Sequence, residues 1–366
     1  MPTYKDSPFP YFGGKGRAAK QVWERLGPVY TYIEPFAGTL AVLRRCPYGP
    51  RPREIANDKD GLLTNAWRSI MYEPEATAYH ADWPTNHIDL IARKSQLLRA
   101  CRTLERELKN DPHFCVPEYG GWWLWAISNS IDMSVAPANK EVAQALERGE
   151  FAGERLASQS RPYTAGRNPL GVSVQRLAQV SKTAPRITSE RRPDIKDCKG
   201  GRGVTAQRMS GNAQKRESLH LWFNSLSERL QCVYFLAGDW LQAVASNTVM
   251  GITPSDPDRI TGIFFDPPYA EGVDARKELY KEEGFDIAGA VQEWAIANGD
   301  NPQLRICIAG YEGDYADYPA GWTSAYWKRG AGMETSGEST LHHRRQEALW
   351  FSPHCLTEEK QLSLLQ

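Results

Sequence analysis

Gly262-Ile263-Phe264-Phe265-Asp266-Pro267-Pro268-Tyr269 is the stretch that predicts the fold of this 366-residue chain. The apolar run after the glycine is typical of a short buried strand. The two prolines end that strand, because neither can donate a hydrogen bond to a sheet and both fix φ. A carboxylate and an aromatic ring therefore stand at the carboxyl end of a strand, which is where open α/β sheets bind their ligands.

The atoms at this strand end suit one kind of chemistry. The Asp266 carboxylate and the Pro267 carbonyl are two acceptors for the two N–H donors of an exocyclic amino group. Accepting both hydrogens draws the nitrogen lone pair out of conjugation and exposes it to an electrophile, while Tyr269 offers a flat face for stacking a planar base. The structural alternative is a Pro-Pro turn in which the aspartate is a cap and the tyrosine is packing.

A second strand-turn-helix pattern begins at residue 30. The β-branched and aromatic residues 30–34 lead into a turn at Gly38, and apolar helical residues are expected from Ala41 to Leu43. Asp58 follows Gly38 by 20 residues and ends another short strand, 54–57. An acid at that distance binds ribose hydroxyls in nucleotide-binding α/β units. The alternative is an ordinary buried strand with a helix cap.

Two shorter patterns complete the candidate site. Gly13-Gly14-Lys15 precedes a helical pattern from Arg17 to Leu26 and could cradle an anion, although the spacing of a P-loop is absent. A solvated glycine-rich turn is the alternative. A helix from 219 to 230 leads into a strand that ends at Asp239, followed by Trp240; this acid also fits the cap of a helix.

Taken together, these motifs resemble a known family. Asp266-Pro267-Pro268-Tyr269 resembles the catalytic motif of amino-group methyltransferases that act on adenine N6. The order of the motifs resembles that of Dam-like N6-adenine DNA methyltransferases, particularly the phage and prophage types, over about half of the chain. The resemblance implies an α/β fold with a Rossmann-like, seven-stranded methyltransferase sheet and an inserted, mostly helical or irregular DNA-recognition region. The expected catalytic domain comprises residues 1–75 and 217–366, and the inserted target-recognition region comprises residues 76–216.

The resemblance also implies a cofactor and roles for individual residues. The cofactor is S-adenosyl-L-methionine, and the target is a flipped-out adenine in double-stranded DNA. One position departs from the family pattern, since Leu40 stands where the second glycine of the cofactor loop is usual. The expected catalytic residues are Asp266, Pro267, Pro268 and Tyr269. The expected cofactor-binding residues are Phe12, Gly13, Gly14, Lys15, Glu34, Pro35, Phe36, Ala37, Gly38, Asp58, Asp239 and Trp240.

A basic segment lies between these motifs. The chain as a whole has a formal net charge of zero, but residues 151–216 hold fourteen basic and four acidic residues, a net charge of +10. A local basic patch on an otherwise acidic chain is the electrostatic footprint of phosphate-backbone binding. A disordered, solvated insertion is a compatible alternative, because such a segment can become ordered on DNA. The expected DNA-binding residues are Arg161, Arg167, Arg186, Arg191, Arg192, Arg202 and Arg344.

Composition limits the other functional classes. No apolar run reaches the roughly 20 residues that span a bilayer, and the N-terminus lacks the apolar core of a signal peptide. The seven cysteines include no Cys-x-x-Cys pair, so we expect no disulfide framework, no metal site and a location in the cytoplasm of a bacterial or phage-infected cell. A monomer or weak dimer is expected. The remaining alternatives are an RNA adenine-N6 methyltransferase, a protein glutamine methyltransferase (which usually has Asn at position 266), and a non-catalytic DNA- or cofactor-binding relative.

Overall fold

The computed structural model describes residues 2–11, 14–130, 135, 213–245, 259–268, 287–311, 318–327 and 347–357. The chain forms two compact units. Unit 1 comprises Met1–Gly13 and Asp60–Gln231, and unit 2 comprises Gly14–Lys59 and Cys232–Gln366. The division into a catalytic domain and an inserted target-recognition region, expected from the sequence, stays a prediction. These compact units differ from it in assigning residues 1–13, 60–75 and 217–231 to unit 1.

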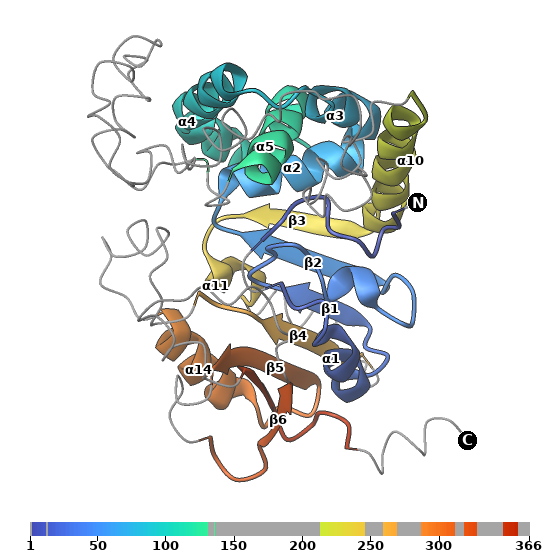
Figure 1. Cartoon of the computed structure of the whole chain (residues 1–366). Helices are drawn as coiled ribbons and strands as arrows, with labels where there is room; N and C mark the ends of the chain where they lie inside the picture. The colour runs from blue at the N-terminus through green and yellow to red at the C-terminus, as the bar shows by residue number, and fades with distance from the viewer. Residues whose placement is uncertain are drawn as a thin grey trace, which may run out of the picture. The chain divides into compact units, whose positions relative to one another are not determined.

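Unit 2 is built on a seven-stranded mixed sheet of order β3-β2-β1-β4-β5-β7-β6 (Figure 1). The first five strands in this order are parallel to one another, whereas β7 is antiparallel to both β5 and β6. The expected seven-stranded α/β sheet is therefore confirmed, in a form compatible with a Rossmann-like fold. The strands are β1 (Thr31–Glu34), β2 (Arg53–Asp58), β3 (Val233–Ala237), β4 (Thr261–Phe265), β5 (Leu304–Tyr311), β6 (Thr323–Trp327) and β7 (Glu347–Phe351).

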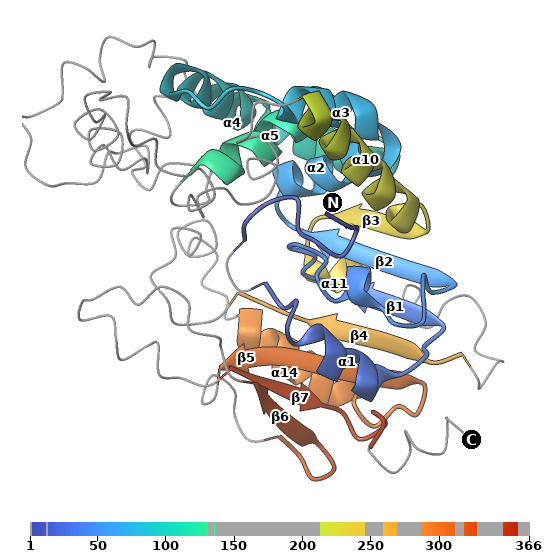
Figure 2. The same ribbon diagram turned by 45° about the vertical axis from the view of Figure 1, so that its right-hand side comes forward.

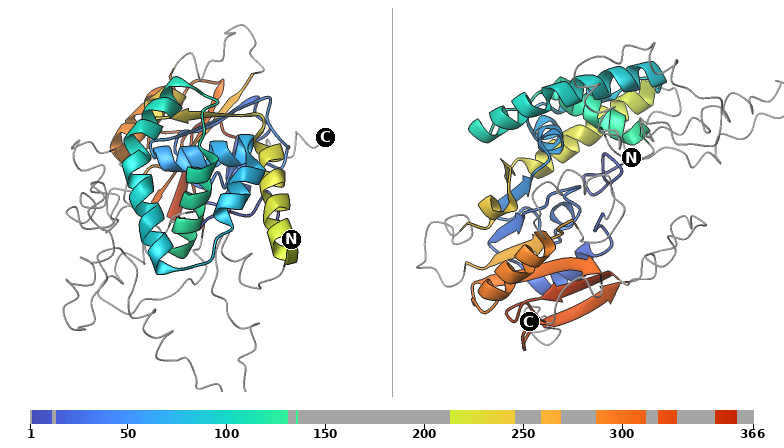
Figure 3. Two further views of the ribbon diagram at one scale, coloured as in Figure 1. Left: turned by 90° about the horizontal axis from the view of Figure 1, so that it is seen from above. Right: turned by 90° about the vertical axis from the view of Figure 1, so that its left-hand side faces the viewer.

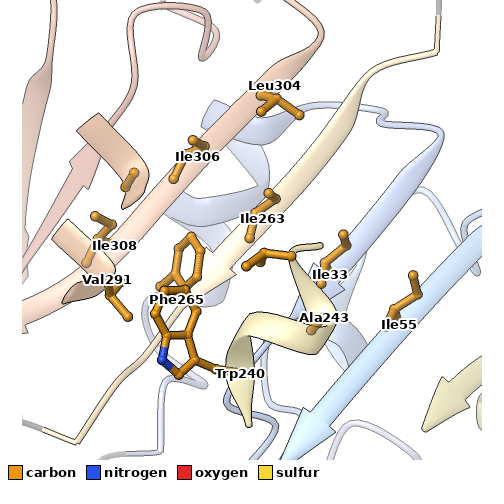
Figure 4. Close-up of a cluster of buried hydrophobic side chains, with 12 residues drawn as sticks. Ile33, Ile55, Trp240, Ala243, Ile263, Phe265, Val291, Leu304, Ile306 and Ile308 are labelled. Atoms are coloured by element: carbon orange, nitrogen blue, oxygen red, sulfur yellow. The ribbon is translucent and has the colours of Figure 1, made fainter. Parts of the chain in front are cut away.

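Helices cover both faces of this sheet, as the turned view in Figure 2 shows. On one face, α11 (Trp240–Ala243) and α14 (Ile287–Asn298) pack against alternate residues of the strands. Figure 4 shows the resulting cluster, which includes Ile33 of β1, Ile263 of β4 and Ile306 of β5. Successive strand residues point to opposite faces, so the continuous apolar run of β4 is explained by burial on both sides. All five residues of β4 are buried.

The other face is covered by α1 (Ala19–Leu26). The Trp23 ring lies 4.5 Å from the Tyr32 ring of β1, centroid to centroid, and Trp23 Nε1 donates to the Val42 carbonyl at 2.8 Å. Gly262 of β4 lies against this layer, where an added Cβ would be 3.1 Å from a methyl group of Val29. The glycine that opens the sequence motif therefore permits close packing on the α1 side of the sheet.

The helical and strand patterns in the sequence predict most of these elements within a few residues. The apolar residues 41–43 are an exception, since the structure has a short 3-10 helix, η1 (Leu43–Arg45), and a turn in place of the expected helical residues. The helix expected from residue 17 begins at Ala19. The sequence pattern did not predict α3 (Pro74–Ala81), whose proline in the first turn was its clearest signal.

The described part of unit 1 is helical, and Figure 3 shows it from two further sides. Its core includes Trp123 and Trp125, whose side chains are both almost fully buried. Gly120 and Gly121 let α5 (Pro117–Asn129) approach its neighbours, because an added Cβ would lie 2.7 Å from the Ser69 side chain or 2.5 Å from His80. The helices are α2 (Gly61–Tyr72), α3, α4 (His87–Asn110), α5 (Pro117–Asn129) and α10 (Ala213–Leu230).

Among the described residues, none of the helices combines the length and the apolar character needed to cross a membrane. The same residues contain no group of three or more His, Cys, Asp or Glu side chains arranged to hold a metal ion.

Candidate functional site

The candidate site lies where the order of the strands reverses. From β1 the chain proceeds outward through β2 to β3, and it then returns to place β4 on the other side of β1. Because these four strands are parallel, their carboxyl ends share one edge of the sheet. Such a switch point is where open α/β sheets bind ligands. The motifs after β1, β2, β3 and β4 are therefore brought to the same edge.

An ion pair joins two of the motifs. Lys15 Nζ lies 2.9 Å from Asp266 Oδ1, and the exposed fractions of the two side chains are 3% and 23%. Lys15 lies in the turn before α1, and its carbonyl accepts a hydrogen bond from Ala19 N–H at 3.0 Å. The N-terminal glycine-lysine motif and the strand-end aspartate are thus parts of one site in unit 2.

The loop after β1 has a left-handed turn. Gly38 has φ of 45° and Leu40 has φ of 53°, a value that favours glycine. Leu40, which stands where the resembling family has a glycine, thus has a backbone conformation that is typical of glycine. The Leu40 side chain is fully buried, so its packing holds this turn. Leu40 N–H also donates to the Ala37 carbonyl at 2.7 Å.

Residues at the end of β2 connect this loop to the loop after β3. Asn57 Nδ2 donates to the Pro35 carbonyl at 3.0 Å and to the Gly238 carbonyl at 3.1 Å. Asp58 Oδ2 accepts a hydrogen bond from Gly38 N–H at 3.0 Å, and the Asp58 carbonyl accepts one from Gly238 N–H at 3.0 Å. The expected cofactor loop and the expected ribose-binding acid are therefore in direct contact.

Asp239 and Trp240 have different environments. Asp239 is exposed and caps α11, since its Oδ1 accepts from Leu241 N–H at 2.9 Å, as the cap pattern predicts. Trp240 is only 7% exposed and points into the sheet's apolar cluster beside Phe265 (Figure 4). The half-buried ring of Phe36 stacks on Trp240 with a centroid distance of 6.2 Å. The Phe36 ring is thus the more accessible of this pair.

Glu34 is the buried acid of the site. Its Oε1 accepts hydrogen bonds from the Tyr32 hydroxyl and from Leu43 N–H, both at 2.7 Å. Burial raises the pKa of Glu34 to about 8, and the charge of Asp266 adds to the rise. The two hydrogen bonds and the charge of Arg44 act in the opposite direction. The pKa of Tyr32 is also raised, mainly by burial.

The remaining predicted residues lie outside the described part of the chain. These are Phe12, Gly13 and Tyr269, together with all seven arginines expected to bind DNA. Gly14, Pro35, Ala37, Pro267 and Pro268 are described, and they lie on the same segments as the contacts above.

Three side chains were not among the predicted site residues. Tyr32 and Asn57 hold predicted residues through the hydrogen bonds above, and the buried Arg44 donates from Nε to the Thr39 carbonyl at 3.0 Å. A polar residue at a buried strand position was the available signal for Asn57. No sequence signal distinguishes Arg44 from a solvated arginine.

Comparisons with known proteins add no identification. The chain matches no protein-family model, and no curated protein sequence matches it.

Proposed function

We propose that this protein is a methyltransferase that uses S-adenosyl-L-methionine to methylate N6 of adenine in DNA. The observation that carries the proposal is the convergence of four motif-bearing strand ends at the switch point between β1 and β4. The motif order of the Dam-like enzymes requires the cofactor loop and the Asp-Pro-Pro-Tyr motif to meet at such an edge. The seven-stranded sheet is also the one that the resemblance implies.

The residues after β1, β2 and β3 fit the proposed cofactor. The Asp58 and Asp239 side chains are acceptors at the ends of adjacent strands, which suits ribose hydroxyls and an adenine amino group. The turn at Gly38 and Leu40 brings backbone close to that edge. Asn57 Oδ1 is buried and has no hydrogen-bond partner among the described residues, which is the kind of atom that a polar ligand can satisfy.

The residues after β4 suit the acceptor base. The cofactor would supply an electrophilic methyl group. An N–C bond would form from the nitrogen lone pair, the electrons of the broken C–S bond would stay on sulfur, and the nitrogen would then lose a proton. Asp266 and the Pro267 carbonyl would hold the amino group in line, while Tyr269 would stack on the base. Positioning of this kind accounts for much of the rate in such transfers. An adenine in a duplex must first be flipped out, at a cost of a few kcal/mol.

The choice of DNA rests on the basic segment. Its charge of +10 over residues 151–216 suits a phosphate backbone, and its place between the cofactor loop and the catalytic motif matches the target-recognition region of the family. An RNA methyltransferase with the same motif is the second candidate. A glutamine methyltransferase is disfavoured by Asp266, and a non-catalytic relative is disfavoured by the intact motif.

The proposal is tested by the distribution of label from S-adenosylmethionine with a labelled methyl group. The protein is offered unmethylated duplex DNA, RNA and a protein extract in separate reactions. Label in DNA is the expected result. Label only in RNA or protein would contradict the assignment of the basic segment, and no transfer to any of the three would favour the non-catalytic relative.

A further inference from the structure

We infer that Lys15 positions the Asp266 carboxylate for an uncharged amino-group acceptor, an inference that rests on the proposed methyltransferase function. The resemblance assigns Lys15 to cofactor contact. In the structure, however, its ammonium pairs with Asp266 at 2.9 Å. Lys15 therefore influences the part of the site that holds the methyl acceptor, through its ion pair with Asp266.

Burial makes this pairing a strong constraint. The Lys15 side chain is 3% exposed, and removing an ammonium from water is strongly unfavourable unless it is paired. A charge-assisted hydrogen bond of this length is among the stronger polar contacts in proteins. The ion pair at Oδ1 consequently helps to hold the Asp266 carboxylate, directly after a strand whose five residues are all buried.

The main chain around Lys15 is fixed on two sides. Its carbonyl is bonded to the first turn of α1. The next residue, Gly16, lies under the Arg45 guanidinium, where an added Cβ would be 3.2 Å from Arg45 Cζ. Arg45 Nη1 in turn donates to the Ala41 carbonyl at 3.1 Å, within the loop after β1. The Arg45 side chain thus links the backbone next to Lys15 to the loop after β1, which is the predicted cofactor loop.

The charge of the pair limits the class of acceptor. Lys15 and Asp266 together have no net charge, so a protonated amine at the strand tip would meet a carboxylate that is already compensated and would lie near a second ammonium. An exocyclic amino group or a carboxamide brings N–H donors without a charge. The pair therefore selects neutral acceptors, such as nucleobases, and disfavours lysine side chains and polyamines.

The test compares Lys15→Met with Lys20→Met. Methionine is of similar length but has no charge, and Lys20 is an 84% exposed lysine in the same helix region, paired at 3.7 Å with Glu24. For Lys15→Met we expect kcat for methyl transfer to fall by about 100-fold, the loss typical of a misplaced reacting group. The dissociation constant of S-adenosylmethionine, measured by calorimetric titration, should stay near the wild-type value. Lys20→Met should change neither quantity.

Two outcomes would overturn the inference. One is a Lys15→Met protein with wild-type kcat at saturating cofactor and weakened cofactor binding, which would make Lys15 a cofactor contact. The other is transfer by the wild type to a lysine-rich peptide as efficient as transfer to DNA, which would contradict selection by charge.

A double-variant comparison keeps the inference separate from the proposed function. Removal of Lys15 alone leaves a carboxylate without its paired ammonium, so Lys15→Met should lower Tm. Adding Asp266→Asn should restore part of that loss. An equal change in Tm on adding Asp266→Asn to Lys15→Met and to the wild type would show that the two residues are not coupled, whether or not the protein transfers methyl groups. Absence of transfer by the wild type to every acceptor would contradict the proposed function instead.

Discussion

The hydroxyl of Tyr32 donates a hydrogen bond to Glu34 Oε1 at 2.7 Å, and both residues are buried in strand β1. Leu43 N–H donates to the same oxygen, so the acid fixes the loop after β1 to the strand before it. This arrangement places an ionisable group in a part of the site that water does not reach. Because Glu34 is buried, the free energy of unfolding of the protein is expected to depend on pH.

We predict that Glu34→Gln is stabilising above about pH 5. Burial raises the pKa of Glu34 from 4.5 to about 8. Both the folded and the unfolded chain hold the proton below the lower value. Between the two values only the folded chain keeps it, so stability decreases as pH rises. The advantage of glutamine should grow by about 1.4 kcal/mol per pH unit in this window. Urea unfolding of both proteins at several pH values measures the difference, and a constant difference would contradict the role of the acid.

A second prediction concerns Asn57, whose amide donates to the carbonyls of Pro35 and Gly238. Asn57→Ala removes both hydrogen bonds and should cost about 1–3 kcal/mol. Asn57→Asp should cost more, because it places acceptor oxygens against two carbonyls. Both variants should weaken binding of S-adenosylmethionine, since the loops after β1 and β3 lose their shared donor. Equal stability of the aspartate and alanine variants in thermal unfolding would argue against this geometry.

The third prediction concerns the left-handed turn. Leu40→Gly and Leu40→Ala both remove a buried side chain, but only glycine relieves the positive φ. The glycine variant should therefore be more stable than the alanine variant by about 1 kcal/mol. Val42 is a matched control, because it is also buried but has φ of −79°. There the order should reverse, with glycine less stable than alanine in the same denaturation measurement.

The basic segment gives a prediction about salt dependence. Replacing Arg191 and Arg192 by glutamine should weaken binding to duplex DNA for all sequences. It should also reduce the slope of log affinity against log salt concentration by about two, one for each lost phosphate contact. Fluorescence anisotropy at several salt concentrations measures both effects, with Lys20→Gln as an exposed control. An unchanged slope would exclude this pair of arginines from the interface.

Much of unit 2 could be predicted from local sequence patterns. Gly262 to Phe265 is a buried strand, as its apolar run followed by two prolines predicts, and the expected helix 219–230 lies within α10. The Asp239 cap follows from an acid placed before an apolar turn. These features depend on residues that are near one another in the chain.

The contacts that assemble the site depend on distant parts of the chain. Nothing local indicates that Lys15 pairs with Asp266 or that Asn57 bonds to Gly238. Leu40 shows a related limit, because its burial outweighs the preference of leucine for negative φ. The Trp240 ring packs in the apolar cluster, which its place after Asp239 does not indicate, and its role beside the cofactor stays a prediction. Tertiary packing therefore decides how these side chains are used.

The most direct test of the proposed function is mass spectrometry of nucleosides digested from unmethylated duplex DNA after incubation with S-adenosylmethionine and the protein. Asp266→Ala is the matched variant, and cofactor titration checks that it still binds S-adenosylmethionine. We predict N6-methyladenine in DNA treated with the wild type and none above background with the variant. N6-methyladenine formed by Asp266→Ala at the wild-type rate, or its absence from DNA treated with a cofactor-binding wild type, would contradict the proposal.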